Sequence, residues 1–221
     1  YNKIFFFQSF FINYKFAFKL TGVYGEKRKI QLRNFALELN RRTGVKQEDP
    51  KDWTEAFSYL RSYMESLDSS VKQVVFLDEL PWLDSKRSGF LSAFEYFWND
   101  YASTKHNFIF VLCGSATSWM DEKITKNKGG LFNRQTCRLY LEPFTLNETE
   151  KFLDKKGINW SRYEIAECYM IMGGIPYYLD LLDSELSLKQ NIDNLFFRKK
   201  GELWDEFEHL YKTLFTNSDN Y

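Results

Sequence analysis

The sequence predicts an α/β fold in which a parallel sheet with crossover helices is followed by an all-helical subdomain. Three observations support this. Short, nearly continuous apolar runs occur at 15–20, 73–79 and 107–113, and such runs are typical of strands buried on both faces. Segments with helical spacing separate these runs, as parallel strands require. After Pro143 the pattern becomes helical only.

The composition is that of a globular domain with an aromatic core. Of 221 residues, 44% are hydrophobic, with 22 Phe and 14 Tyr, which is enough for a sizeable core. Lys+Arg and Asp+Glu number 30 each, so the net charge gives no overall attraction to nucleic acid or anionic membrane. Three widely spaced cysteines and two histidines argue against a disulfide framework or a metal centre built from them, and indicate a cytoplasmic protein.

The aromatic run at 4–12 is the one segment that could be mistaken for a targeting signal. It lacks a small-residue cleavage site and has a single Lys before it. It is far too short to span a bilayer. We interpret it as a buried strand or core helix, and we expect no membrane association.

The first half of the α/β region alternates strand and helix. The apolar run at 15–20 breaks at Gly22, which predicts a strand followed by a turn. An amphipathic pattern over 26–42 is closed by Gly44 and has basic residues in its last turn, as helix C-termini prefer. Residues 51–68 carry apolar side chains at helical spacing and predict a second helix.

The second half continues the same alternation. The run at 73–79 is β-branched and apolar, and the run at 107–113 is similar, so both are predicted strands. Phenylalanines at helical spacing mark a helix over 90–101 between them. A short strand is also predicted at 138–141, and Pro143 would end it.

Four helices are predicted after Pro143. The first three begin at recognisable start signals, namely the capping boxes Thr145 to Glu148 and Ser161 to Glu164, and Pro176 at a first helical position. Apolar residues over 201–215 line one side of the fourth. We therefore divide the chain into an α/β core over residues 1–143 and a helical lid subdomain over residues 144–221.

Two adjacent carboxylates, Asp78 and Glu79, end the strand predicted at 73–79. The carboxyl ends of strands are where α/β proteins bind ligands. The first acid could hold Mg²⁺ directly or through water, and the second could orient an attacking water. The alternative is an acidic turn in which Asp78 caps the next element, and the dipeptide alone does not separate the two interpretations. The apolar segment that follows argues against a simple polar turn.

Ser115 follows the next predicted strand. If the strands at 73–79 and 107–113 are neighbours, a small polar side chain here lies beside the acidic pair and could bond a water or a γ-phosphate. The alternative is an ordinary strand-to-helix turn in which Ser115 or a nearby Thr is a helix N-cap.

Two further segments combine glycines with functional residue types. Arg134 follows Gly129-Gly130, and such a loop suits presentation of a guanidinium to a phosphate, in cis or from a neighbouring subunit. Its alternative is a solvated surface arginine. Gly174 and Pro176 stand beside two tyrosines that could flank a base, and their alternative is a helix C-cap, a turn and a new helix.

Taken in this order, these pieces resemble the prokaryotic AAA+/STAND-like ATPases known as the archaeal ATPase family. The resemblance lies in residues 74–83, 110–115, 130–134, 139–144 and 173–179. It implies a P-loop NTPase-like fold that uses ATP and Mg²⁺. In a Walker B motif, Asp78 would bind the metal and Glu79 would be the catalytic carboxylate.

The resemblance also implies roles for the remaining candidates. Ser115 stands at the sensor-1 position of the family, and Arg134 is a candidate arginine finger or sensor. Gly174 and Pro176 would contact the nucleotide base.

The sequence departs from the family in one respect. It contains no Gly-x-x-x-x-Gly-Lys-Ser/Thr motif, and none of its 11 glycines is followed by Lys. Backbone amides and the lysine of that loop cradle phosphates. We therefore expect a truncated or degenerate ATPase core that binds ATP weakly and hydrolyses little. The alternative is a non-catalytic AAA-like protein-interaction module or a DNA-associated regulator.

A sheet without its first strand would also have an open edge, at the strand over 15–20 or the strand over 73–79. Such an edge recruits another strand. The aromatic run at 4–12 could fill it in cis, or a second copy could do so, which predicts a homo-oligomer. DNA or protein partners would act through domains outside this chain.

Overall fold

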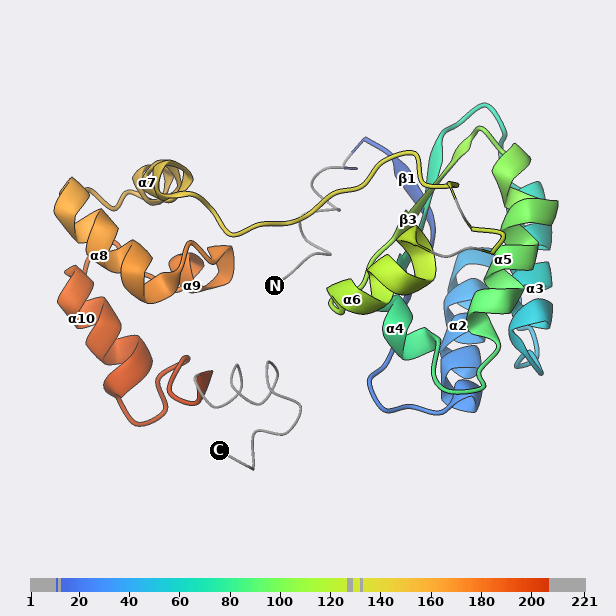
Figure 1. Cartoon of the computed structure of the whole chain (residues 1–221), viewed down its shortest axis with the longest axis horizontal. Coiled ribbons are helices and arrows are strands. Elements are labelled where there is room, and N and C mark those ends of the chain that lie inside the picture. Colours follow the sequence, from blue (N-terminus) through green and yellow to red (C-terminus); the bar gives the residue numbers. More distant parts are fainter. Residues whose placement is uncertain (1–10, 12, 127–128, 132, 207–221) are drawn as a thin grey trace. The chain divides into compact units, whose positions relative to one another are not determined.

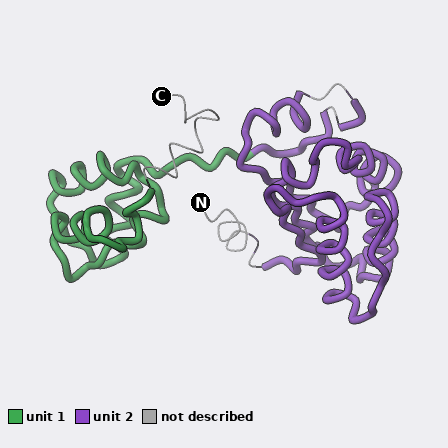
Figure 2. Tube along the Cα trace, turned by 90° about the horizontal axis from the view of Figure 1, so that it is seen from below, with its two compact units in different colours: residues 1–6, 139–221 green, residues 7–138 purple. Residues whose placement is uncertain are grey.

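The computed structural model describes residues 11, 13–126, 129–131 and 133–206. The chain divides into two compact units, one extending to Arg138 and one from Leu139 onward (Figure 2). The first contains the sheet, and the described part of the second contains only helices. The functional division that we expected at 143 stays a prediction.

Three parallel strands form the sheet in the order β1-β2-β3 (Figure 1). They are β1 (Lys15–Thr21), β2 (Gln73–Asp78) and β3 (Phe108–Leu112). This confirms the three predicted strands and their parallel direction. β2 is buried along its whole length and is paired on both sides, so our alternative of an open edge at the strand over 73–79 is wrong.

Three long helices pack on one side of the strands (Figure 1) and confirm the predicted crossovers. They are α2 (Arg28–Thr43), α3 (Trp53–Glu65) and α5 (Phe90–Asp100). Shorter elements complete this unit: α4 (Leu80–Leu83), the 3-10 helix η1 (Ala102–Thr104), α6 (Thr117–Met120) and the π-helix η2 (Asp121–Thr125).

Aromatic packing dominates the core of this unit, as the composition predicted. Phe57 on α3 is 2% exposed and is stacked on Phe97 of α5 with a centroid distance of 5.1 Å. Four further rings surround Phe57, namely Phe35, Trp53, Phe90 and Phe94. Such pairs stabilise beyond their area burial, so Phe57 joins α2, α3 and α5 beneath the sheet.

The helical unit contains α7 (Leu146–Lys155), α8 (Arg162–Met172), α9 (Pro176–Asp180), α10 (Leu188–Ile192) and the π-helix η3 (Asp193–Phe197). Both predicted capping boxes are present, at Thr145 and Ser161. A third, from Ser187 to Gln190, starts α10 and was missed. Burial in the core of this unit raises the pKa of the Cys168 thiol to about 11.

The short strand predicted at 138–141 is wrong. These residues form no regular secondary structure and pair with no strand among the described residues, and Leu139 and Tyr140 are 54% and 56% exposed. The side chain of Arg138 bonds to Asp121 and to Thr125 of η2. The intrinsic preference of this segment for strand finds no neighbouring strand among the described residues, and local preference alone does not form a strand.

The fourth predicted helix, over 201–215, lies outside the described residues beyond Glu206. Up to Glu206 the chain forms turns, and Leu203 is buried against Leu195 of η3. The aromatic run at 4–12 also lies outside the described residues, except for Phe11. No helix in the described ranges is both long and apolar enough to cross a membrane.

The position of Phe57 at the centre of the aromatic core predicts a large effect of its truncation. Phe57→Ala should lower the free energy of unfolding by about 3–5 kcal/mol, because it leaves a cavity among five rings. Tyr96→Ala is the control, since Tyr96 is 63% exposed on α5 and its loss should cost less than about 0.5 kcal/mol. Urea unfolding followed by near-UV circular dichroism measures both. Equal losses would contradict this account of the core.

Candidate active site at the carboxyl ends of the strands

The carboxyl ends of the three strands lie side by side. Thr21 of β1 is in register with Asp78 of β2, and the N–H of Gly22 donates to the Asp78 carbonyl at 2.9 Å. On the other side, the N–H of Cys113 donates to the Leu77 carbonyl at 2.9 Å. The predicted neighbours are therefore neighbours in the sheet, and the residues that follow them meet at one edge.

Asp78 is the last residue of β2 and is only 4% exposed. A carboxylate is costly to bury unless a cation or hydrogen bonds compensate it. The described residues contain no group of three or more His, Cys, Asp or Glu that could hold a metal. A metal at Asp78 would therefore take most of its ligands from phosphate or water, which is how Mg²⁺ is commonly bound.

Glu79 adopts a left-handed backbone conformation, with φ 49° and ψ 50°. For a non-glycine residue this costs about 1–2 kcal/mol. The conformation turns the chain out of β2 and into α4, where the N–H of Leu80 donates to the Cys113 carbonyl at 3.0 Å. Strained residues of this kind often occur at functional sites, and the sequence carried no sign of the strain.

Ser115 holds the Glu79 side chain. Both its N–H and its hydroxyl donate to Oε2 of Glu79, at 3.1 Å and 2.8 Å. Ser115 is exposed and Glu79 is half-buried. The alternative that Ser115 is a helix N-cap is wrong, because α6 is preceded by Ala116 without a side-chain cap. The structure thus brings together Asp78, Glu79 and Ser115.

Glycines that follow both neighbouring strands make room for the start of α4. A Cβ at Gly22 would lie 2.6 Å from the Glu79 carbonyl oxygen, and a Cβ at Gly114 would lie 2.9 Å from Cδ of Pro81. Both distances are shorter than side chains tolerate. The backbone at Glu79 and Pro81 therefore depends on the absence of side chains at Gly22 and Gly114.

Gln31 of α2 ties the turn after β1 to α4 and was not predicted. Its side chain is fully buried; it accepts from the Val23 N–H at 3.1 Å and donates to the Val23 carbonyl at 2.8 Å. It also donates to the Trp82 carbonyl at 3.2 Å. A glutamine on a charged amphipathic helix gives no sign of such a role, because the partners come from distant segments.

Asp84 ends α4 and has an altered acidity. Burial raises the pKa of this carboxyl, and the N–H of Leu91, the cation of Lys123 and a bond from Ser88 partly oppose the rise. The Leu91 N–H donates to Asp84 Oδ1 at 3.4 Å. Asp84 thus anchors the connection from α4 to α5.

No hydrogen bond or ion pair among the described residues joins Arg134 to the acidic pair. The loop before it is docked on α5, where the Gly130 N–H donates to Glu95 Oε1 at 2.6 Å and the Gly130 carbonyl accepts from Asn99 at 3.0 Å. Arg134 itself is exposed, and within the described ranges its side chain makes no hydrogen bond or ion pair.

Gly174 and Pro176 lie in the helical unit, and local structure explains both. Gly174 has φ +65°, and a Cβ there would clash with the Phe144 carbonyl oxygen. The Phe144 N–H donates to the Gly174 carbonyl at 2.8 Å. Pro176 occupies the first turn of α9, where its missing N–H costs nothing. These observations favour the turn-and-new-helix interpretation.

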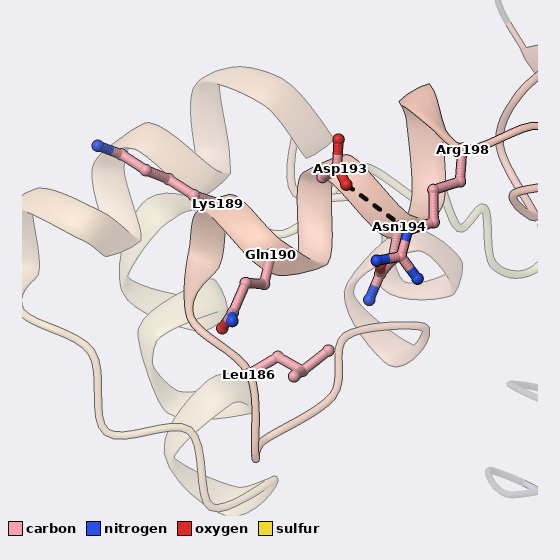
Figure 3. Close-up of a pocket in the computed structure, with 6 residues that line it drawn as sticks. All are labelled: Leu186, Lys189, Gln190, Asp193, Asn194 and Arg198. Carbon is pink, nitrogen blue, oxygen red and sulfur yellow. Dashed lines mark ion pairs between the residues drawn. The ribbon is translucent and has the colours of Figure 1, made fainter.

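A separate hollow of about 490 Å³ lies on the helical unit (Figure 3). It is lined by Leu186, Lys189, Gln190, Asp193, Asn194 and Arg198. Arg198 and Asp193 form an ion pair of 3.6 Å across it, with side chains 70% and 62% exposed. Such a solvated ion pair contributes little to stability. None of these residues was predicted to carry chemistry.

The chain is similar to an ATPase family and to an uncharacterized archaeal protein. A family described as an ATPase domain predominantly from Archaea matches residues 5–182. The uncharacterized protein MJECL04 of Methanocaldococcus jannaschii is 28% identical over 144 residues, which cover 62% of this chain and 29% of that protein. The chain thus spans less than a third of that relative.

One solved structure is similar in fold. The Walker-type ATPase PABY2304 of Pyrococcus abyssi matches with a TM-score of 0.59 and 19% sequence identity. The match covers 92% of this chain and 66% of that one. It confirms the predicted P-loop NTPase-like α/β fold.

The left-handed conformation of Glu79 predicts an unusual order of stability for two variants. Both Glu79→Gly and Glu79→Ala lose the contact with Ser115, but only glycine relieves the strain. Glu79→Gly should therefore be more stable to urea than Glu79→Ala by about 1 kcal/mol. In ordinary helix or strand, glycine is the less stable of the two by about 0.5–1 kcal/mol. A Glu79→Gly variant that is less stable than Glu79→Ala would contradict the strained turn.

Proposed function

The chain belongs to the family of ATPase domains found predominantly in Archaea, and we propose that the carboxyl edge of its sheet is the hydrolytic half of an ATP site. The family is one of ATPase domains, and the solved structure with a similar fold is a Walker-type ATPase. The observation that carries the proposal is the convergence of Asp78, Glu79 and Ser115 where β2 and β3 end.

The donor set at this edge suits Mg²⁺ and a hydrolytic water. Asp78 offers a hard oxygen ligand beside the strand ends, of the kind that Mg²⁺ prefers. When bound, Mg²⁺ neutralises charge on the phosphates and orients them. Glu79 is the next residue, and in the proposed role its carboxylate orients the attacking water and accepts its proton.

Ser115 acts in this proposal by fixing Glu79. Two hydrogen bonds to one carboxylate oxygen define the direction of the side chain. A base already held in place need not be reoriented during the reaction, and such preorganisation is a large part of catalysis. Ser115 is also close enough to the acidic pair to serve as the sensor of the bound phosphate.

The phosphate-binding half is the weaker part of the site. No phosphate-loop motif occurs in the sequence, so we propose that this chain binds ATP weakly and turns it over slowly. Arg134 remains a proposed finger or sensor, acting in cis or from a neighbouring subunit. Gly174 and Pro176 remain proposed base contacts, although local structure already accounts for both.

The proposal extends to location and partners. An ATPase of this kind, with the free and exposed thiol of Cys137, suits the reducing cytoplasm. A second copy would bind through an open sheet edge, and DNA or protein partners would bind through other domains.

Titration of the chain with Mg²⁺-ATP in a calorimeter tests the proposed site. We expect binding in the range of about 0.1–1 mM, well below the affinity of a complete phosphate site. Asp78→Asn should weaken this binding at least tenfold, because it removes the anionic metal ligand and keeps the shape. Glu79→Gln should bind within about threefold of the wild type, and any hydrolysis should fall by about 10² or more.

Asp100→Asn is the matched control, because Asp100 is an exposed aspartate at the end of α5 and pairs with Arg61. It should bind Mg²⁺-ATP as the wild type does. Equal affinity of Asp78→Asn and the wild type, or no binding at 10 mM ATP, would overturn the proposal. Hydrolysis that persists in Glu79→Gln would show that Glu79 is not the carboxylate that activates the attacking water.

A further inference from the structure

The turn between β1 and α2 presents an aromatic ring to solvent. Residues 23–30 are all exposed, and Tyr24 among them is 79% exposed. Its ring contacts the half-buried Trp82 of α4 in a T-shaped arrangement, with centroids 5.7 Å apart. This contact leaves most of the Tyr24 side chain open. A single exposed aromatic residue is ordinary on its own, so its surroundings decide what it can do.

The backbone beside Tyr24 is held in place. The buried side chain of Gln31 bonds to the N–H and the carbonyl of Val23, at 3.1 Å and 2.8 Å, and to the Trp82 carbonyl at 3.2 Å. The Val23 carbonyl also accepts from the Glu26 N–H at 3.3 Å. The ring is thus presented by a fixed turn, and a preorganised group loses little conformational freedom when it binds a ligand.

Four exposed cations follow Tyr24 closely in sequence, namely Lys27, Arg28, Lys29 and Arg33. The only acid within residues 22–33 is Glu26. Among the described residues none of the four cations has an ion pair, whereas Arg41 and Arg42 at the other end of α2 both pair with Glu38. The positive charge of this segment is therefore not compensated by the described part of the chain.

Helix stability does not explain these cations. Helix N-termini favour acidic residues, but the first turn of α2 contains none. Lys29 and Arg33 are four residues apart on the helix, where like charges repel each other. Cations that lower the stability of their own helix suit an anionic ligand that compensates them.

The positive charge extends to a neighbouring connection. Lys86 and Arg87 are exposed between α4 and α5, and Figure 1 shows this connection at the same end of the unit as the turn after β1. Asp84 lies in the same connection, but it is half-buried and accepts from the Leu91 N–H. The exposed charges around the ring of Tyr24 are therefore mainly positive.

We propose that Tyr24 and the four cations form a basic-aromatic surface that binds single-stranded nucleic acid. The Tyr24 ring stacks on an unpaired base, and the cations bind the phosphates on either side of that base. Cations alone would suit any polyanion. The open ring beside them favours a strand with unpaired bases, because every base offers a flat face for stacking, whereas the bases of a duplex are already stacked on each other.

This inference does not depend on the proposed ATP site. The basic-aromatic surface belongs to the α/β unit itself and contains neither Asp78, Glu79 nor Ser115. Binding of a strand can be measured without ATP or Mg²⁺, so either proposal can fail while the other stands.

Fluorescence anisotropy of a labelled oligothymidylate of about 12 nucleotides tests the surface. The 221-residue chain should bind it with a dissociation constant of about 1–100 μM at low salt. On a double-logarithmic plot, the binding constant should fall with salt concentration with a slope of about −2 to −3, as three or four phosphate contacts require.

Exchange of the tyrosine tests stacking. Tyr24→Ala should raise the dissociation constant about fivefold or more and leave the salt slope unchanged, because it removes a ring and no charge. Tyr24→Phe keeps the ring and should bind as the wild type does. Tyr163→Ala is the matched control, since Tyr163 is 73% exposed on α8 of the other unit, and its binding should be that of the wild type.

Neutralisation of cations tests the phosphate contacts. Lys29→Gln combined with Arg33→Gln should weaken binding and reduce the magnitude of the salt slope by about 1.4, because two phosphate contacts are lost. Lys46→Gln combined with Lys51→Gln is the control with the same net charge. Both of these lysines are exposed beyond the other end of α2, so the slope should not change. Far-UV circular dichroism verifies the fold of each variant.

Two kinds of result would overturn the proposal. The first is no binding at roughly 50 mM salt, or a Tyr24→Ala variant that binds as the wild type does. The second is equal affinity for a duplex of the same length, or displacement of the strand by polyglutamate of equal charge. Either would show a surface for polyanions in general, in which the tyrosine has no part.

Discussion

β2 lies between β1 and β3, and this parallel pairing brings the carboxyl ends of all three strands to one edge. The strand is buried along its whole length, so its position is set by packing above and below it and by a ladder on each side. A slip of the register by one residue would move Asp78 away from Thr21 and exchange the side chains that pack on the two buried faces. The geometry of the acidic pair therefore depends on the same interactions that form the core.

The strained turn after β2 lowers the net stability that the core provides. Glu79 has a left-handed backbone at a cost of about 1–2 kcal/mol, whereas a single buried ring such as Phe57 contributes about 3–5 kcal/mol. The strain directs the carboxylate of Glu79 to Ser115 on the neighbouring strand end, where two hydrogen bonds fix it. Gly22 and Gly114 permit the close approach of the backbone. A carboxylate fixed in this way fits the role that we propose for Glu79.

Much of the α/β unit could be predicted from the sequence, because apolar runs and helical spacing reflect burial directly. Asp78 and Ser115 were placed together because the ends of adjacent parallel strands must meet. The role of Gln31 could not be predicted, since its partners lie in segments distant from α2 in sequence. The strand expected at 138–141 failed because local preference needs a neighbouring strand. The capping box at Ser187 was readable from its spacing and was overlooked.

Paramagnetic broadening by Mn²⁺-ATP is the most direct test of the claim that the carboxyl edge of the sheet holds the metal. Mn²⁺ replaces Mg²⁺ at such oxygen sites, and the broadening of amide NMR signals falls steeply with distance from the ion. The account predicts strong broadening at Gly22, Glu79 and Ser115, and much less at Lys15 and Gln73, which begin β1 and β2 at the opposite end. Broadening confined to the amino ends of the strands or to the helical unit would contradict it.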